Sequence, residues 1–249
     1  MLLKDGERLD YVNDDIELIQ KTDGLTFGTD ALLLAGYISG YYKRATELGS
    51  GSGIISMLLL TRNKAASVTA LEVQEEYADL TQRNAEHNGL SKRLDAVCCD
   101  LRSFKPGAET ELVFTNPPYM RSDSGKANTS EKKNAARHEV HGTIDDFCKY
   151  GAAMLKYGGS FAVVYRPDRL IDLMCAMRNS GLEPKRMTLV HADESSVPSM
   201  VLCEGKKGGK SGVKLTRPLI IYRDKAHKEY TDDMNYIMEN GSFPADFGK

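Results

Sequence analysis

Apolar and polar residues alternate along the first part of the chain, which is the pattern of strands with one buried face. The alternation covers residues 8–12 and 16–20, and the Asn-Asp-Asp run between them is a turn signal. An apolar run over residues 31–38 then follows Thr29 and Asp30, and either of these side chains can cap a helix. This part of the chain is therefore predicted to form a hairpin and one helix.

From residue 45 onward, short apolar runs alternate with longer amphipathic segments. The predicted strands lie near residues 45–49, 67–73, 94–100, 111–115, 160–165, 187–192 and 200–204, with a further short apolar run at 219–222. The predicted helices lie near residues 54–61, 75–88, 143–157 and 168–179, with one or two helical turns after Thr231. Alternating strands and helices predict an α/β fold, with a seven-stranded, mostly parallel sheet, helices on both faces and an antiparallel C-terminal hairpin.

No repeat and no convincing linker divides the chain, so residues 1–249 are expected to form one domain. Within it, residues 1–44 hold the hairpin and first helix, and residues 45–249 form the core. A polar segment at residues 120–138 interrupts the alternation. Polar segments of this length inside compact domains are usually functional loops or disordered ones.

The fourth predicted core strand runs directly into Asn116-Pro117-Pro118-Tyr119. Two prolines remove two backbone donors and fix φ twice, so the chain must leave the sheet here and stay rigid. A plain strand-ending turn is the simplest interpretation of two prolines. The flanking asparagine and tyrosine add an amide oxygen, an unpaired carbonyl and a flat ring, which suit a planar molecule that carries an amino group.

A glycine loop and three acids follow the earlier strands. Gly49, Gly51 and Gly53 lie between a strand and a helix, where glycines let a ligand approach the backbone. Their Gly-x-Gly-x-Gly spacing differs from the pattern of dinucleotide sites. Glu47, Glu72 and Asp100 each close a successive strand. A single acid there is usually a solvated cap, but three acids on one carboxyl edge indicate a ligand site.

At these residues the chain resembles the Rossmann-like class I methyltransferases, which use S-adenosylmethionine. In that class an acid of the Glu47 type and the glycines surround the amino-acid part of the cofactor, an acid of the Glu72 type binds the ribose hydroxyls, and one of the Asp100 type meets the adenine amino group. The resemblance predicts a cofactor site made of Asp30, Glu47, Gly49, Gly51, Gly53, Glu72, Val73, Asp100, Leu101 and Asn116. For Asp30, a role as helix cap remains an equal alternative.

The Asn-Pro-Pro-Tyr motif narrows this resemblance to enzymes that methylate a nitrogen conjugated to a ring or a carbonyl. Such a nitrogen is a poor nucleophile because its lone pair is delocalised. If the Asn116 side chain and the Pro117 carbonyl each accept one N–H, the amino group is held for in-line attack, and Tyr119 can stack on the acceptor. The predicted catalytic residues are Asn116, Pro117, Pro118 and Tyr119.

Two acceptors share this motif, namely adenine N6 in nucleic acid and glutamine amides in proteins. The runs at 27–35, 134–139, 165–170 and 206–210 resemble the bacterial tRNA adenine-N6 methyltransferases, which act next to the anticodon of a valine tRNA. The glutamine enzymes act on release factors and carry a helical domain before the glycine loop, whereas only 46 residues precede Glu47 here. A cofactor-binding but non-catalytic RNA-binding protein is the second alternative.

Charge modifies this picture only locally. The net charge is −2, so no global basic field attracts nucleic acid. Two basic segments, 120–138 and 204–217, are expected near the catalytic edge or its flank, although solvated turns would show the same composition. The residues expected to contact tRNA are Arg121, Lys126, Lys132, Lys133, Arg137 and His138.

The remaining signals are mostly negative. No leader-like start and no apolar run long enough to span a bilayer is present, so a cytoplasmic protein with reduced cysteines is expected. His138 and His141 are one residue too close for a helical zinc motif, so no metal is expected. No obligate protein partner is evident.

Overall fold

The computed structural model describes residues 3–23, 27–117 and 142–248. Its first element is the predicted hairpin, in which β1 (Glu7–Asn13) and β2 (Ile16–Lys21) pair antiparallel with a bulge between Tyr11 and Asn13. This hairpin forms a two-stranded sheet of its own, and β2 packs against α3 (Glu75–His87). The sequence prediction of a hairpin is therefore confirmed.

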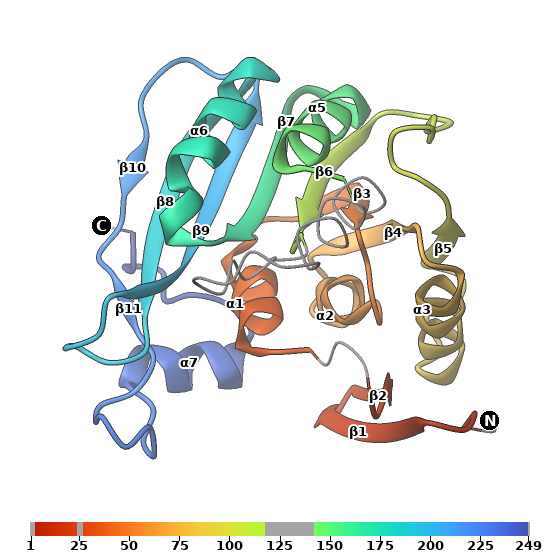
Figure 1. The fold of residues 1–249 in the computed structure, drawn as a ribbon, viewed down its shortest axis with the longest axis horizontal. Coiled ribbons are helices and arrows are strands. Elements are labelled where there is room, and N and C mark those ends of the chain that lie inside the picture. Colours follow the sequence, from red (N-terminus) through yellow and green to blue (C-terminus); the bar gives the residue numbers. More distant parts are fainter. Residues whose placement is uncertain (1–2, 24–26, 118–141, 249) are drawn as a thin grey trace, which may run out of the picture.

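The other strands form one nine-stranded sheet (Figure 1). They are β3 (Tyr42–Leu48), β4 (Ala65–Glu72), β5 (Leu94–Cys98), β6 (Thr110–Thr115), β7 (Leu155–Tyr165), β8 (Leu182–His191), β9 (Pro198–Lys207), β10 (Lys214–Leu215) and β11 (Leu219–Ile220). The order across the sheet is β10-β8-β9-β7-β6-β3-β4-β5, and β11 also pairs with β8. Within this sheet, β9 is the only described strand that runs antiparallel to all its neighbours. The Rossmann-like fold with an antiparallel C-terminal hairpin is confirmed.

Two short strands extend the predicted seven. β11 falls within the apolar run noted at residues 219–222, whereas β10 is a Lys-Leu pair without any periodic signal. Both pair with the outer edge of β8 in parallel. Strands of two residues are shorter than any hydrophobic period, so backbone pairing with β8 forms them rather than their own sequence.

Helices cover both faces of the sheet (Figure 1). They are α1 (Thr29–Tyr37), α2 (Ile54–Thr61), α3, α5 (Ile144–Met154), α6 (Leu170–Asn179), the 3₁₀ helix η1 (Pro167–Arg169) and α7 (Asp232–Asn240). Successive residues of β6 show why both faces need cover. Leu112 and Phe114 join the apolar cluster that includes α1 and α2, and Val113 between them joins the cluster of α5 and α6. A strand that is buried on both faces therefore appears in the sequence as a continuous run of apolar residues.

The helix ends are close to the predicted ones, with two differences. α1 begins at Thr29 with Gly28 as its N-cap and no side-chain cap bond, so the expectation that Thr29 or Asp30 caps this helix is wrong. α5 ends at Met154 rather than near residue 157, because the chain continues directly into β7. The last helix is well defined, since the Thr231 hydroxyl accepts from the Met234 N–H and Gly241 closes α7 at φ 61°.

No helix within residues 3–23, 27–117 and 142–248 is both long enough and apolar enough to cross a membrane. All five cysteines are free thiols. Cys148 and Cys203 are fully buried, and burial raises the pKa of Cys203 to about 12. These two thiols therefore act as small apolar packing groups.

Candidate active site

Four of the predicted site residues lie side by side at the carboxyl edge of the sheet. The strands β6, β3, β4 and β5 are neighbours in this order and run parallel. Asn116 follows β6, Glu47 is the penultimate residue of β3, Glu72 ends β4, and Asp100 lies just beyond β5. With strands roughly 4.8 Å apart, this row spans about 14 Å. The structure thus brings together the residues that the strand order indicated, and their binding roles stay predictions.

The three glycines of the loop after β3 all have left-handed backbone conformations. Gly49, Gly51 and Gly53 have φ values of 72°, 55° and 80°. A Cβ on Gly53 would lie 2.8 Å from Cγ2 of the buried Thr81, so this position also needs the space. A Cβ on Gly51 would meet no atom within 4 Å. Two different constraints therefore select glycine here, namely packing at Gly53 and an open approach to the backbone at Gly51.

Glu72 connects this glycine loop to the end of β4. Its side chain is buried, with 6% of its surface exposed. One carboxylate oxygen accepts from the Gly51 N–H at 3.0 Å, and the other accepts from the Gln74 N–H at 3.0 Å. Each oxygen has a second lone pair, so the carboxylate can accept two further hydrogen bonds. A vicinal diol such as a ribose presents such a pair of donors.

The far side of the glycine loop is held by α3, through residues that sequence reasoning missed. The Thr81 hydroxyl donates to the Gly51 carbonyl at 2.9 Å. The Asn84 amide donates to the carbonyls of Ser52 at 3.0 Å and Ile19 at 3.1 Å, and its oxygen accepts from the Ile19 N–H at 2.7 Å. These two residues could have been identified from the sequence, because Thr81 and Asn84 are polar residues three positions apart on the otherwise apolar, buried face of a helix.

Glu47 lies beneath the loop rather than on its open side. It is 1% exposed and its carboxyl accepts a hydrogen bond from the Ser56 hydroxyl of α2. Burial raises its pKa to about 8, although Ser56 partly offsets this effect. An acid in such a place ionises readily only beside a positive charge.

Asp100 has an ion-pair partner. The Arg102 Nε lies 2.9 Å from both carboxylate oxygens, and an Arg102 terminal nitrogen lies 2.5 Å from Oδ2. This guanidinium lowers the pKa of Asp100, so the side chain stays an ionised acceptor. The neighbouring Leu101 is buried and Val73 is half-buried, and they supply apolar surface beside this acceptor.

Asn116 is tied to the first helix across the edge of the sheet. Its side-chain nitrogen donates to Oδ2 of Asp30 at 2.8 Å. The other oxygen of Asp30 accepts from the Ala31 N–H at 3.0 Å in the first turn of α1. Thr115 fixes the backbone just before Asn116, because its hydroxyl donates to the Leu48 carbonyl at 2.8 Å. Asp30 thus lies at the acceptor end of the row, and its proposed contact with the cofactor is untested.

Only part of the predicted acceptor side lies within the described residues. Pro117 is buried directly after Asn116. The other predicted catalytic and tRNA-contacting residues lie outside the described residues; they are Pro118, Tyr119, Arg121, Lys126, Lys132, Lys133, Arg137 and His138.

The first part of the second basic segment, residues 204–210, lies away from this edge, so for these residues the expectation is wrong. Lys206, the penultimate residue of β9, pairs with Ser160 in the middle of β7. The Tyr157 hydroxyl donates to the Gly208 carbonyl at 3.1 Å, and Lys207 donates to the Leu155 carbonyl at 2.6 Å. Because β9 is antiparallel, its end and the turn after it lie at the amino edge of the parallel strands.

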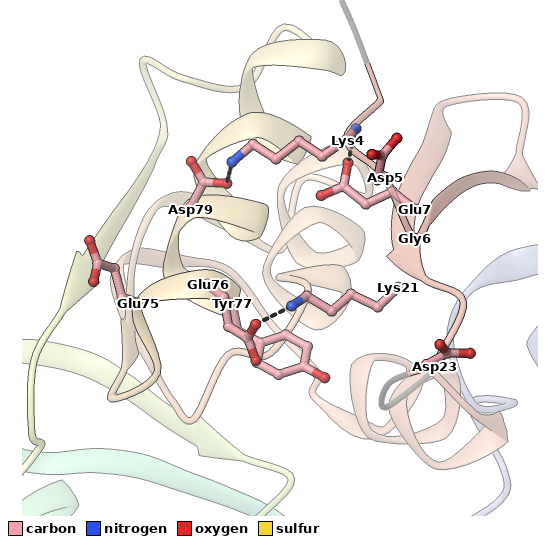
Figure 2. A pocket seen from close by; sticks show the side chains of 10 residues that line it. All are labelled: Lys4, Asp5, Gly6, Glu7, Lys21, Asp23, Glu75, Glu76, Tyr77 and Asp79. Carbon is pink, nitrogen blue, oxygen red and sulfur yellow. Dashed lines mark hydrogen bonds and ion pairs between the residues drawn. The ribbon is translucent and has the colours of Figure 1, made fainter.

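A surface groove lies between the hairpin and α3 (Figure 2). Its walls are joined by two ion pairs, one between Lys4 and Asp79 at 2.5 Å and one between Lys21 and Glu76. The residues that line it are Lys4, Asp5, Gly6, Glu7, Lys21, Asp23, Glu75, Glu76, Tyr77 and Asp79. Carboxylates outnumber ammonium groups here, so this groove does not suit nucleic-acid phosphates.

The carboxyl edge fits S-adenosylmethionine on the chemistry of its side chains. Glu72 offers lone pairs for two hydroxyls, Asp100 is an ionised acceptor, and the backbone at Gly51 is open. A sulfonium cofactor carries no phosphate, so a phosphate-binding loop is not needed.

The comparisons with known proteins agree with this geometry. Residues 22–170, more than half of the chain, match the family described as methyltransferase small domain. A tRNA1(Val) (adenine(37)-N6)-methyltransferase of Bacteroides fragilis is 28% identical over 179 residues, which cover 70% of this chain and 74% of that protein. The protein of the same name from Bacteroides thetaiotaomicron is 27% identical over 207 residues, which cover 82% and 86%.

Solved structures with the same fold include a predicted O-methyltransferase of Agrobacterium tumefaciens, with a TM-score of 0.70 at 21% identity, covering 86% of this chain and 98% of that one. A tRNA m1G37 methyltransferase of M. jannaschii gives a TM-score of 0.52 at 13% identity, covering 82% of this chain and 55% of that one. The matched family segment contains the glycine loop, the three acids and Asn116. The chain therefore belongs to the methyltransferase small domain family and is a Rossmann-like methyltransferase that uses S-adenosylmethionine.

Proposed function

We propose that this methyltransferase acts on N6 of an adenine in tRNA. The observation that carries the proposal is the place of Asn116 and Pro117, which directly follow β6, the neighbour of the β3 strand that leads into the glycine loop. Relatives named tRNA1(Val) (adenine(37)-N6)-methyltransferase, which are 25–28% identical, support the choice of adenine and of tRNA. A valine tRNA and a nucleotide next to the anticodon are the finer part of the proposal.

In this proposal the acceptor side overcomes the weak nucleophilicity of an aromatic amine. The Asn116 side-chain oxygen and the Pro117 carbonyl each accept one N–H of the adenine amino group, which draws the nitrogen toward tetrahedral geometry and frees its lone pair. Pro118 keeps this turn rigid, and Tyr119 stacks on the base. S-adenosylmethionine supplies the electrophilic methyl group. The target base must leave its stack to reach this site, which an anticodon loop permits.

We assign the cofactor to the row of acids. Glu72 accepts the ribose hydroxyls while it holds the Gly51 and Gln74 N–H groups, and Asp100 accepts from the adenine amino group between Val73 and Leu101. Glu47, Gly49 and Gly53 shape the end that receives the amino-acid part. A cationic ammonium group there would favour the ionised form of Glu47, whose pKa burial raises to about 8.

We assign the tRNA contacts to the segment after the motif. With residues 206–210 at the opposite edge of the sheet, the basic residues of 120–138 remain the candidates closest in sequence to Asn116. Arg121, Lys126, Lys132, Lys133, Arg137 and His138 contact phosphates in this proposal. We also propose that residues 1–249 work as one domain.

A competition assay tests the acceptor class. The protein is incubated with methyl-labelled S-adenosylmethionine, bulk tRNA and a release factor together, and the RNA and protein fractions are counted separately. Label in RNA alone is the expected result. Label in the release factor alone would contradict the proposal in favour of a glutamine methyltransferase, and cofactor binding without any transfer would favour a non-catalytic RNA-binding protein.

A further inference from the structure

Asp30 and Asn116 form a hydrogen bond between side chains that lie 86 residues apart in the chain. Asp30 is the second residue of α1, and Asn116 is the first residue after β6. The two Asp30 oxygens have separate partners. Oδ2 accepts from the Asn116 side-chain nitrogen at 2.8 Å, and Oδ1 accepts from the Ala31 N–H at 3.0 Å. The carboxylate is thereby fixed at both ends.

This bond favours one of the two orientations of the Asn116 amide. An ionised carboxylate can only accept hydrogen bonds, so the amide group must turn its nitrogen, and not its oxygen, toward Asp30. The oxygen then lies on the opposite side of the amide as an acceptor. The two orientations of a carboxamide have almost the same shape, and only hydrogen-bond partners select between them. A flipped Asn116 would present a donor to an amino group, which needs an acceptor.

The Asp30 carboxylate occupies space that a side chain at position 28 would fill. A Cβ on Gly28 would lie 2.8 Å from Oδ1 of Asp30. Gly28 has φ −118° and ψ −176°, an extended conformation that any residue can adopt, so its backbone does not require glycine. The missing side chain instead leaves the space that the carboxylate occupies.

α1 itself is held by its buried side and by hydrogen bonds at its C-terminal end. Leu33 and Leu34 are fully buried. At its C-terminal end, Lys64 donates to the carbonyls of Ala35 at 2.7 Å and Ile38 at 2.7 Å. The helix therefore holds Asp30 in a fixed place relative to the sheet.

We propose that Asp30 is a positioning residue, which locks the Asn116 amide with its oxygen toward the acceptor nitrogen. The inference rests on the proposed function, because the amide orientation matters only when the acceptor is an amino group. Asp30 acts through Asn116 and needs no contact of its own with cofactor or substrate. A charged partner also polarises the amide and makes its oxygen a stronger acceptor.

The test compares three variants in methyl transfer to tRNA, with kcat, KM and cofactor Kd measured separately. Asp30→Ala removes the carboxylate that accepts from the Asn116 nitrogen, so kcat should fall on the order of 10- to 100-fold with cofactor Kd close to wild type. Asp30→Asn can still accept from the Asn116 nitrogen and should recover part of the loss. Gly28→Ala keeps the Asp30 charge but displaces the carboxylate, and it should lower kcat without weakening cofactor binding.

Asp145→Ala is the matched control, because Asp145 is likewise the second residue of its helix, α5, and is exposed. It should leave kcat unchanged. A raised cofactor Kd with wild-type kcat in Asp30→Ala would overturn the proposal and make Asp30 a cofactor ligand. An Asp30→Ala variant as active as wild type would also overturn it. Failure of the proposed function is a different result, in which the wild type itself transfers no methyl group to tRNA.

Discussion

At the scale of single residues, the three acids at the carboxyl edge differ in burial and in their hydrogen-bond partners. Glu47, Glu72 and Asp100 are all at the predicted edge, yet the first is buried, the second braces a loop and the third is paired with Arg102. The role of Glu72 depends on Gly51, a partner that is distant in sequence. The partner of Asn116 was equally hidden, since Asp30 belongs to another element.

Glu47 gives the molecule a predictable pH dependence. Its folded-state pKa is about 8, against 4.5 as the ordinary value for this group. The native state thus binds more protons between these values, so the unfolding free energy should fall as pH rises from about 4.5 to about 8, by at most about 1.4 kcal/mol per pH unit. Glu47→Gln keeps an oxygen for the Ser56 hydroxyl but cannot ionise, so it should remove this fall.

Urea unfolding of the cofactor-free protein at pH 5, 6.5 and 8 measures this effect. Glu47→Gln should match the wild type at pH 5 and exceed it at pH 8. Equal slopes against pH in both proteins would show that Glu47 is ionised in the native state.

At the scale of elements, the hydrophobic pattern predicted helices and strands correctly where the apolar side chains of the segment itself pack in the core. The bounds of α2 agree with the prediction at both ends. The chain turns away after α3 at Gly89, which has a left-handed conformation with φ 68°. The predictions of elements were wrong or incomplete where contacts with another segment, and not the segment's own sequence, determine its structure. β10 exists because β8 offers backbone partners, and Gly28 caps α1 without any side-chain bond.

Two substitutions in the glycine loop should have different effects, one mainly on the stability of the fold and the other also on cofactor binding. Gly53→Ala places a Cβ 2.8 Å from Thr81 Cγ2 at φ 80°, so it should lower the unfolding free energy by about 2–3 kcal/mol. Gly51→Ala meets no atom within 4 Å, so it should cost only the backbone strain, about 1–2 kcal/mol. Its Cβ would enter the open space above the loop, and calorimetry should show weaker cofactor binding.

The two glycine variants act as controls for each other. A Gly51→Ala protein that binds S-adenosylmethionine as tightly as the wild type would mean that the cofactor does not approach this side of the loop. Chemical denaturation and titration calorimetry on both proteins give the comparison.

At the scale of the whole molecule, the order of strands and helices along the chain predicted which strands end at the same edge of the sheet. It did not predict at which edge the turn after the antiparallel strand β9 lies. The parallel strands placed Asn116 and the three acids correctly, because each strand ends at the same edge. Residues 204–210 were misplaced because β9 is the antiparallel strand, and its direction follows from tight pairing with β8 and β7. Composition alone made the two basic segments look alike.

The two basic segments should therefore differ in RNA binding. Reversing the charges of Lys132 and Lys133 to Glu should weaken tRNA binding and reduce the slope of log affinity against log salt by about 2. Lys206 and Lys210 are exposed at the opposite edge, so the same reversal there should leave both quantities unchanged. Filter binding across a salt series measures the effect. Stronger loss from the Lys206 and Lys210 variant would move the tRNA site to the amino edge.

The central claim is methyl transfer to adenine N6 at Asn116, and nucleoside analysis tests it most directly. Wild type and Asn116→Ala are incubated with S-adenosylmethionine and tRNA, the RNA is digested, and mass spectrometry quantifies N6-methyladenosine. The account predicts N6-methyladenosine from the wild type and almost none from Asn116→Ala, with cofactor affinity retained in both. Product that lacks N6-methyladenosine, or an undiminished yield from Asn116→Ala, would contradict it.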